Sequence, residues 1–370
     1  MAFAGGIAVT DVLATPFHAR ASAANRFNRW KPRNGWTLAA DYGRAQDEAI
    51  AARLNCAVAD ISWRWRVAIE GRRAEEFLSR LVTRDPARLA PGTAFKALWL
   101  NDHGGVRGAG VIARYGRESF RLISTAADLS WIARAAALFD VTVRDIGQEE
   151  GGLAIVGPHA RRVAEAAGLD PALEPSNFRK IFWRALDVTL SRFGEHGGYE
   201  LWCKADDASI VWDRIAKAGA EYALRPAGLD AMDILDLEAG VPRPERDYEP
   251  ARDGFGAEPS PFDLGLESLI DDLHKLFNGR AALRGSRKTK ARVGLEFDGE
   301  TPMPRMPLLR GAEPVGRIWS SLYSPSLRGA IALAQVNLDA AAPGTELVCG
   351  GQIARVCALP FLPVPDSIGE

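Results

Sequence analysis

The sequence predicts an α+β fold in which two sheet-plus-helix modules are followed by a small C-terminal β barrel. Three observations predict it. Strands alternate with single helices in the first part of the chain, and this order begins again at the segment GGLAIVGPHA, residues 151–160. From about Ala291 the helical pattern stops, and short strands separated by turns replace it. The 370 residues suffice for two or three such units, because single cores usually stop growing somewhat below this size.

An N-terminal arm without a regular pattern, residues 1–40, precedes the first module, which we expect at residues 41–150. Each module is predicted to be a sheet with helices on one side. The apolar periodicity of the first module predicts five elements in this order: a helix at 47–54, a strand at 65–69, a helix at 74–81, a strand at 120–124 and a helix at 128–139.

The second module is expected at residues 151–284 and the barrel domain at 285–370. Residues 241–262 are rich in proline, glycine and charge, which predicts a long loop, and such loops in compact domains are often functional. The pattern of the second module predicts five elements: a strand at 153–156, a helix at 161–167, strands at 187–191 and 199–203, and a helix at 207–218.

The composition excludes several classes of protein. The formal net charge of −1 lacks the positive excess of nucleic-acid binders. The four cysteines have no metal-ligand or redox spacing, so no metal is expected. No apolar run approaches the ~20 residues of a membrane-spanning helix, and the N-terminus lacks the basic segment of a signal peptide. We therefore expect a cytoplasmic protein that binds neither nucleic acid nor membrane; the sequence does not predict its oligomeric state.

Four segments carry a family resemblance: NDHGGVRGAGV at 101–111, RFGEHGGYELW at 192–202, GLDAMDILDLEAG at 228–240 and VGRIWSSLYSPSLRGAIALAQV at 315–336. In this order and spacing they resemble the tetrahydrofolate-dependent aminomethyltransferase family, which includes the glycine cleavage T protein and folate-dependent demethylases. The resemblance extends over roughly residues 41–363. It implies a cloverleaf of three parts around a central hole for tetrahydrofolate.

The resemblance also implies that a carboxylate of the second module meets the pterin ring. Glu200 matches it, because it lies in a predicted strand behind two glycines, and one carboxylate can accept two adjacent N–H donors. A surface glutamate is the structural alternative. Trp202 in the same segment, Glu238 and Arg317 are further cofactor candidates. In relatives Glu238 lies near the folate, although it could instead pair with an arginine, and Arg317 lies where the barrel closes the hole.

Three departures from the aminomethyltransferase pattern argue against glycine cleavage. Gly108 and Ala109 occupy the positions of an acidic pair that supports chemistry on the aminomethyl adduct in relatives. Met232 replaces a basic residue, and Trp63 stands where many relatives have histidine. The loop EHGGYE at 195–200 is instead more similar to that of the demethylases.

The sequence therefore predicts a tetrahydrofolate-dependent methyltransferase that moves a methyl group from a small methylated substrate, preferably a methoxylated aromatic acid, to N5 of tetrahydrofolate. Dimethylsulfonio and N-methyl donors stay open, as does transfer at the formaldehyde level to give 5,10-methylenetetrahydrofolate. An alternative of another class is a folate-binding accessory protein, although the cysteine motif of such relatives is missing at residues 276–285.

A phenolate leaving group requires a proton donor or a cation. His196, in the loop that leads to Glu200, is the best-placed catalytic candidate, since histidine can deliver a proton near neutral pH. A solvated loop histidine is the alternative. His103 and Tyr323 are the other catalytic candidates; for them, a capped turn and packing beside a proline are the alternatives.

Four residues are candidates for substrate binding. The Arg107 guanidinium could hold a substrate carboxylate. Arg29 and Trp30 belong to a basic arm that could bind an aromatic acid or the glutamate tail of folate, or could be a solvated surface. Trp63 is one of ten tryptophans that would suit a planar substrate, although most tryptophans are expected in the core.

Overall fold

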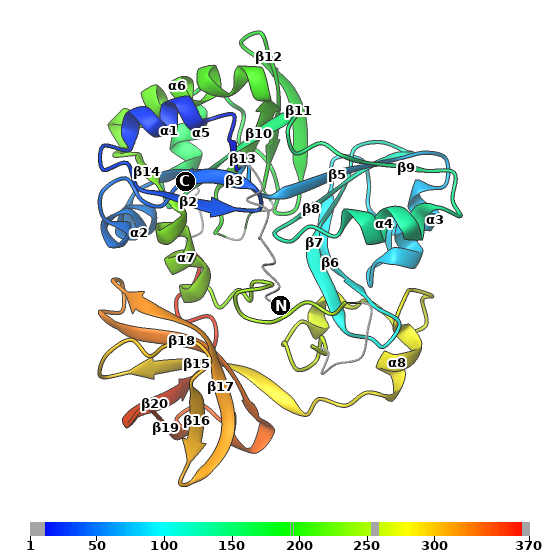
Figure 1. Cartoon of the computed structure of the whole chain (residues 1–370). Coiled ribbons are helices and arrows are strands. Elements are labelled where there is room, and N and C mark those ends of the chain that lie inside the picture. The colour runs from blue at the N-terminus through cyan, green and yellow to red at the C-terminus, as the bar shows by residue number, and fades with distance from the viewer. Residues whose placement is uncertain (1–11, 193, 195, 253–258, 365–370) are drawn as a thin grey trace, which may run out of the picture.

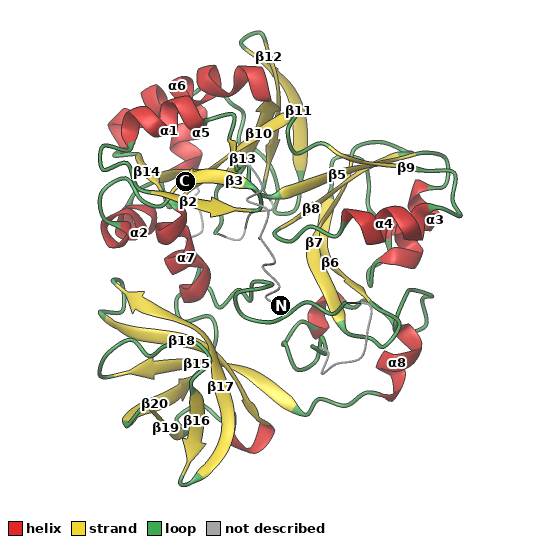
Figure 2. Cartoon of the chain, viewed as in Figure 1, coloured by secondary structure: helices red, strands yellow, loops and turns green. Residues whose placement is uncertain are grey.

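Three lobes make up the protein, and they confirm the predicted fold class (Figure 1). The computed structural model describes residues 12–192, 194, 196–252 and 259–364. Figure 2 shows that two lobes combine sheet and helix, whereas the third consists almost entirely of strands. Five short 3-10 helices are interspersed with these elements: Pro86–Arg88, Ala205–Asp207, Ala220–Tyr222, Glu267–Leu269 and Leu338–Ala340.

The first lobe is a five-stranded antiparallel sheet with two helices, α3 (Ala74–Leu81) and α4 (Leu129–Ala136). Alternate side chains of the sheet and the apolar faces of both helices share one buried core, as the predicted alternation requires. The strand order is β6 (Ala94–Leu100), β7 (Val106–Arg114), β8 (Ser119–Ser124), β5 (Trp65–Glu70) and β9 (Thr142–Asp145).

The second lobe is a six-stranded sheet with helices on both faces, which corrects the expectation of one covered face. Helices α5 (Ala160–Ala166) and α6 (Ala208–Gly219) cover one face, and α2 (Ala45–Leu54) and α7 (Leu229–Glu238) cover the other. The strand order is β11 (Phe178–Trp183), β12 (Leu186–Ser191), β13 (Tyr199–Lys204), β10 (Glu150–Val156), β4 (Ala57–Asp60) and β14 (Arg225–Ala227).

The expected boundaries of the first module and of the arm need correction. Strand β4 belongs to the second lobe, because it pairs antiparallel with β10 and parallel with β14. The described part of the arm is also regular. It forms α1 (His18–Ala24) and a three-stranded sheet, whose order is β1 (Leu13–Ala14), β3 (Trp36–Ala39) and β2 (Trp30–Arg33).

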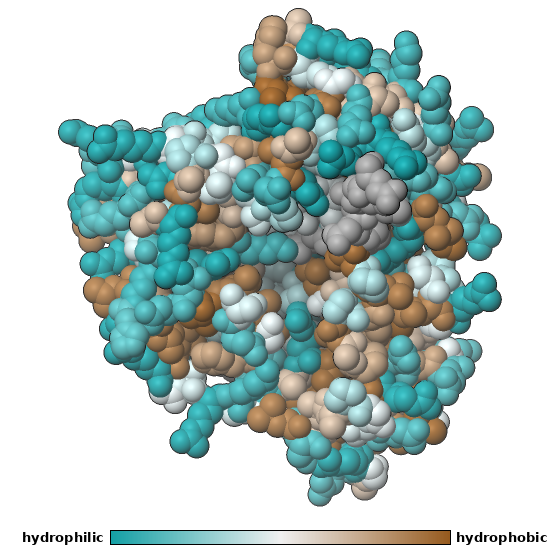
Figure 3. Space-filling model, turned by 180° about the vertical axis from the view of Figure 1, so that it is seen from behind, coloured by the Kyte–Doolittle hydropathy of each residue, from teal (hydrophilic) through white to brown (hydrophobic). Residues whose placement is uncertain are grey.

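The third lobe is a closed six-stranded barrel, reached through α8 (Arg280–Gly285). Buried aliphatic side chains fill its interior. Seen from behind, polar side chains form most of the outer rim of the molecule (Figure 3). No helix in the described ranges is long and apolar enough to cross a membrane. Around the barrel the strands follow the order β15 (Lys290–Phe297), β18 (Gly329–Asn337), β17 (Glu313–Ser324), β16 (Pro307–Arg310), β19 (Glu346–Cys349) and β20 (Gln352–Cys357).

Candidate functional site

A cavity of about 300 Å³, here called the central cavity, lies where the lobes meet. Its walls come from β6, β7 and β8 of the first lobe, from residues 239–244 after α7, from residues 265–269 and from the first barrel strand. Every charged side chain among its described lining residues is a cation: Arg64, Lys96, Arg243 and Arg292. The cavity is therefore suited to an anionic ligand.

Glu200 lies beside this cavity as the second residue of β13, where it pairs with Ala154 on one side and Ser191 on the other. Its side chain is only 2% exposed. The Arg64 guanidinium, which lines the cavity, donates from Nη1 to Glu200 Oε1. Glu200 Oε2 is buried and has no hydrogen-bond partner among the described residues. A buried acceptor without a donor is rare, and a ligand N–H would satisfy it.

The neighbouring Tyr199 points to the opposite face of the sheet, as the strand period predicts. Its hydroxyl donates to the carbonyl of Pro171 at 3.0 Å, and its ring lies in the core beneath α5 and α6. The strand thus presents Glu200 toward the lobe junction because Tyr199 fills the core behind it.

His196 supports a wall of the central cavity from behind. It is 6% exposed, and its Nε2 lies 2.8 Å from Asp236 Oδ1 on α7, although the alignment is poor for a hydrogen bond. Arg243, a lining residue, donates from Nε to Asp236 Oδ2 at 2.7 Å. Burial alone would raise the pKa of the Asp236 carboxyl, but Arg243 and His196 hold this pKa well below its usual range.

The depressed pKa of Asp236 predicts a pH-dependent contribution to stability. The ionised carboxylate stabilises the fold above the unfolded pKa of ~3.9, and this contribution is lost as the pH falls through the folded value. We expect Asp236→Asn to lower the free energy of unfolding near pH 5, and to do so by a shrinking amount below pH ~4. Urea unfolding across this range measures the difference; a constant difference down to pH 2 would contradict the assignment.

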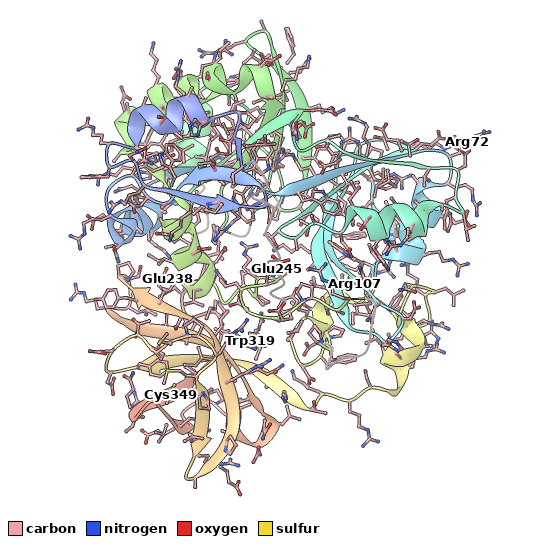
Figure 4. The ribbon with its side chains drawn as sticks, in the orientation of Figure 1. Arg72, Arg107, Glu238, Glu245, Trp319 and Cys349 are labelled. Carbon is pink, nitrogen blue, oxygen red and sulfur yellow. The ribbon has the colours of Figure 1, made fainter. Side chains whose placement is uncertain are left out.

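Glu238, a predicted cofactor ligand, instead joins the second lobe to the barrel. Its carboxylate is fully buried, accepts from Arg53 Nε at 2.8 Å and accepts from the Ser324 hydroxyl at 2.6 Å. Figure 4 shows Glu238 at the end of α7 beside the barrel. The structure therefore shows the alternative for Glu238, in which its carboxylate pairs with an arginine.

Arg107, predicted to hold a substrate carboxylate, is bound within the first lobe. Its Nε and Nη2 donate to the two oxygens of Asp128, each at 2.9 Å, and its guanidinium lies 4.5 Å from the ring centroid of Trp131. Trp99 Nε1 approaches the same carboxylate at 3.3 Å. A substrate carboxylate would therefore have to compete with Asp128 for this guanidinium, which argues against the predicted role.

The remaining barrel and turn candidates lie on the surface. Tyr323 is 45% exposed, Arg317 is exposed on the same strand, and neither lines the central cavity. His103 is exposed in a turn where Asn101 Oδ1 accepts from the backbone N–H groups of His103 at 3.1 Å and Gly105 at 2.9 Å. These hydrogen bonds support the alternative given for His103, a turn that is capped by a neighbouring side chain.

The candidate tryptophans and Arg29 are dispersed. Trp202 is buried between the sheets under the Arg66 guanidinium, 4.7 Å from its ring centroid. Trp63 lines a second cavity. Trp30 stacks on His18 with 4.6 Å between centroids, and Arg29 pairs with Asp41. Neither Trp30 nor Arg29 lines either cavity.

Sequence reasoning missed the cations of the central cavity. Arg64 directly follows Trp63, which was noted as a departure from the family pattern. Arg243 lies in the long loop at residues 241–262 that was expected to be functional. The proline, glycine and charge content of this loop was therefore the signal in the sequence that could have pointed to Arg243. Nothing in the local sequence pairs Arg64 with Glu200, which lies 136 positions further along the chain.

Comparison with known proteins agrees with this architecture. Residues 18–271 match the GCVT N-terminal domain, and residues 290–362 match the glycine cleavage T-protein C-terminal barrel domain. An aminomethyltransferase of Geobacillus kaustophilus is 30% identical over 345 residues, which cover 88% of this chain and 93% of the relative. An aminomethyltransferase of Bacillus cereus strain AH187 is 29% identical over 348 residues, covering 90% and 92%.

The crystal structure of the glycine cleavage system aminomethyltransferase T from Bartonella henselae superimposes with a TM-score of 0.86 at 25% identity, covering 97% of this chain and 100% of that one. The chain belongs to the GCVT family of aminomethyltransferase-type proteins. It is a tetrahydrofolate-dependent one-carbon transferase.

Proposed function

We propose that this enzyme transfers a one-carbon unit at the formaldehyde level from an aminomethyl-type donor, such as an S-aminomethyl thiol, to tetrahydrofolate. The products are 5,10-methylenetetrahydrofolate, ammonia and the free carrier thiol, and the two new carbon–nitrogen bonds replace the carbon–nitrogen and carbon–sulfur bonds of the donor. The similarity to aminomethyltransferases over most of both chains favours this reaction over the aromatic demethylation expected from the sequence. The observation that carries the folate site is the buried, unpartnered Glu200 Oε2 beside a cavity lined by cations.

The residues present fit tetrahydrofolate. Glu200 Oε2 can accept from a ring or exocyclic N–H of the pterin, which would orient the ring. Lys96 and Arg292 at the cavity wall suit the carboxylates of the glutamate tail, whereas Arg243 is held by its bidentate pair with Asp236. When bound, tetrahydrofolate supplies the nucleophilic nitrogen that accepts the one-carbon unit. The work of the protein is to hold the ring on Glu200 and to align a donor with it.

Transfer of a methyl group to give 5-methyltetrahydrofolate is a second candidate, favoured by one observation. A Cβ at Gly108 would lie 2.2 Å from Cζ2 of Trp99, so the buried indole occupies the space of any side chain there. Ala109 lines the central cavity without a polar group. The acidic pair expected in aminomethyltransferases is therefore replaced by an apolar wall. Arg107 is occupied by Asp128, which removes the main support for an aromatic acid as the donor.

Product analysis tests the proposal. Purified protein is incubated with tetrahydrofolate and, separately, an S-aminomethyl thiol, methylated ammonium and sulfonium compounds, and methoxybenzoates. Folate products are then identified by mass spectrometry. We expect 5,10-methylenetetrahydrofolate with the aminomethyl donor. 5-Methyltetrahydrofolate from any methylated donor, with no methylene product, would instead establish the second candidate.

A further inference from the structure

Two segments carry the chain from the second lobe into the first and back, and one buried arginine binds both. Residues 61–64 lead from β4 of the second lobe into β5 of the first, and residues 146–149 lead from β9 back to β10. Arg66, the second residue of β5, is 1% exposed and donates hydrogen bonds to both segments. A single guanidinium therefore ties the two crossings together.

The two terminal nitrogens of Arg66 each donate to two backbone carbonyls. Nη1 donates to Ser62 and Arg64, each at 3.0 Å, and Nη2 donates to Gly147 at 2.5 Å and to Glu150 at 2.7 Å. Nε is buried without a hydrogen-bond partner among the described residues, and the Glu150 carboxylate lies 3.7 Å away. A planar guanidinium has five donors in fixed directions, whereas a lysine ammonium has three and cannot satisfy four carbonyls.

Burial of this cation has a cost. Burial lowers the pKa of the Arg66 guanidinium, although an arginine stays protonated inside a protein. Carbonyl dipoles and an aromatic face replace its water, since the guanidinium lies 4.7 Å from the ring centroid of Trp202. An apolar side chain could fill the same space without desolvation of a charge, which indicates that Arg66 does more than pack.

The groups that Arg66 contacts adjoin the carboxylate of the pterin site. Trp202 and Glu200 are two residues apart on β13 and therefore point to the same face of the sheet. A Cβ at Gly152, opposite on β10, would lie 2.4 Å from Cζ3 of Trp202, so the indole packs directly on this glycine. Nη1 of Arg66 also holds the carbonyl of Arg64, whose guanidinium donates to Glu200 Oε1. Arg66 thus contacts both the strand that carries Glu200 and the residue that binds it.

We propose that Arg66 is a positioning residue for the cofactor, which fixes the direction in which the Glu200 carboxylate faces the pterin. It acts through the backbone of Arg64 on one side and the indole of Trp202 on the other. The inference rests on the proposed function, because it takes the pterin to be bound at Glu200. It gives Trp202, a predicted cofactor residue, an indirect part through Arg66.

Arg66→Lys tests the proposal, because it keeps the charge but not the planar set of donors. We expect this variant to weaken tetrahydrofolate binding by about 5- to 20-fold, since misplacing a group by about 1 Å can cost up to about 100-fold. Isothermal titration calorimetry measures the affinity, and the melting temperature shows whether the variant is folded. Unchanged affinity in the folded variant would overturn the inference.

A double-mutant cycle with Glu200→Gln separates positioning from a general loss of structure. In the Glu200→Gln background, Arg66→Lys should change folate affinity by less than about two-fold, because the carboxylate that Arg66 positions is already gone. A purely structural role would weaken binding by the same factor in both backgrounds.

Arg114→Lys is the matched control. Arg114 ends β7 of the same lobe, donates to three backbone carbonyls at 3.1 to 3.2 Å and lies 5.1 Å from the ring centroid of Phe120. It does not line the central cavity. Its replacement should lower the melting temperature but leave folate affinity unchanged.

Trp202→Phe provides a second test if Arg66→Lys does not fold. It places a smaller ring against the guanidinium and should weaken folate binding by about two- to five-fold, again only while the Glu200 carboxylate is present. Equal effects with and without that carboxylate, or a similar loss of affinity in Arg114→Lys, would overturn the inference alone. Full folate affinity in Glu200→Gln would instead show that the pterin placement of the proposed function is wrong, and the inference would fall with it.

Discussion

Replacing Glu200 by glutamine is expected to weaken tetrahydrofolate binding by about 10- to 100-fold. Hydrogen bonds to charged groups are worth ~1.5–3 kcal/mol, and the amide would present N–H donors where the pterin needs an acceptor. The carboxylate is buried, and one of its oxygens has no partner among the described residues, so the ligand would supply the missing donor. Isothermal titration calorimetry measures the loss.

Arg64→Met separates the role of the carboxylate from that of its ion pair. It keeps Glu200 but removes its counterion and one cation of the cavity wall, so folate affinity should fall as well, by less than in Glu200→Gln. The double variant removes both charges and reports whether an unpaired Arg64 is responsible for the effect. Undiminished folate affinity in Glu200→Gln would place the pterin elsewhere.

The second large effect concerns stability. Glu238→Ala should lower the free energy of unfolding by ~3–5 kcal/mol, because it leaves the mostly buried Arg53 guanidinium without its counterion. The hydroxyl of Ser324 loses its acceptor as well. Thermal unfolding measures the loss, and the folded fraction should retain its folate affinity.

A paired replacement separates charge from packing at this junction. Arg53→Met combined with Glu238→Leu removes both charges and should recover much of the stability, since buried ion pairs can often be exchanged for apolar residues at little cost. Loss of folate affinity in Glu238→Ala at unchanged stability would contradict the structural role and restore Glu238 as a cofactor ligand.

The elements that the sequence predicted are those with clear alternation or helical periodicity. Strand β5 follows from Trp65, Val67 and Ile69, which all point into one core. Neither β6 nor β7 was predicted. In β7 the glycines of the segment 101–111 interrupt the alternation, and Gly108 is required there by the ring of Trp99. The placement of β4 in the second lobe depends on long-range pairing with β10, which no local pattern contains.

Contacts between residues far apart in the sequence also limit how much of the candidate site could be predicted. Glu200 could be predicted because the family pattern and the strand period both pointed to it. The pairing of Arg107 could not be predicted, because the sequence shows an arginine but not the Asp128 carboxylate that folding brings against it. His196 was expected beside the site because it lies in the loop that leads to Glu200; its contact with Asp236 on α7 instead sets it behind the cavity wall. Partners far apart in sequence decide whether a charged residue is available to a ligand.

A crystal structure of the protein with bound 5-methyltetrahydrofolate would decide whether Glu200 holds the pterin. We expect the pterin ring in the central cavity, with a ring or exocyclic nitrogen within hydrogen-bond distance of Glu200 Oε2, and the glutamate tail near Lys96 or Arg292. A pterin bound outside the central cavity, or bound within it without contact to Glu200, would contradict this assignment.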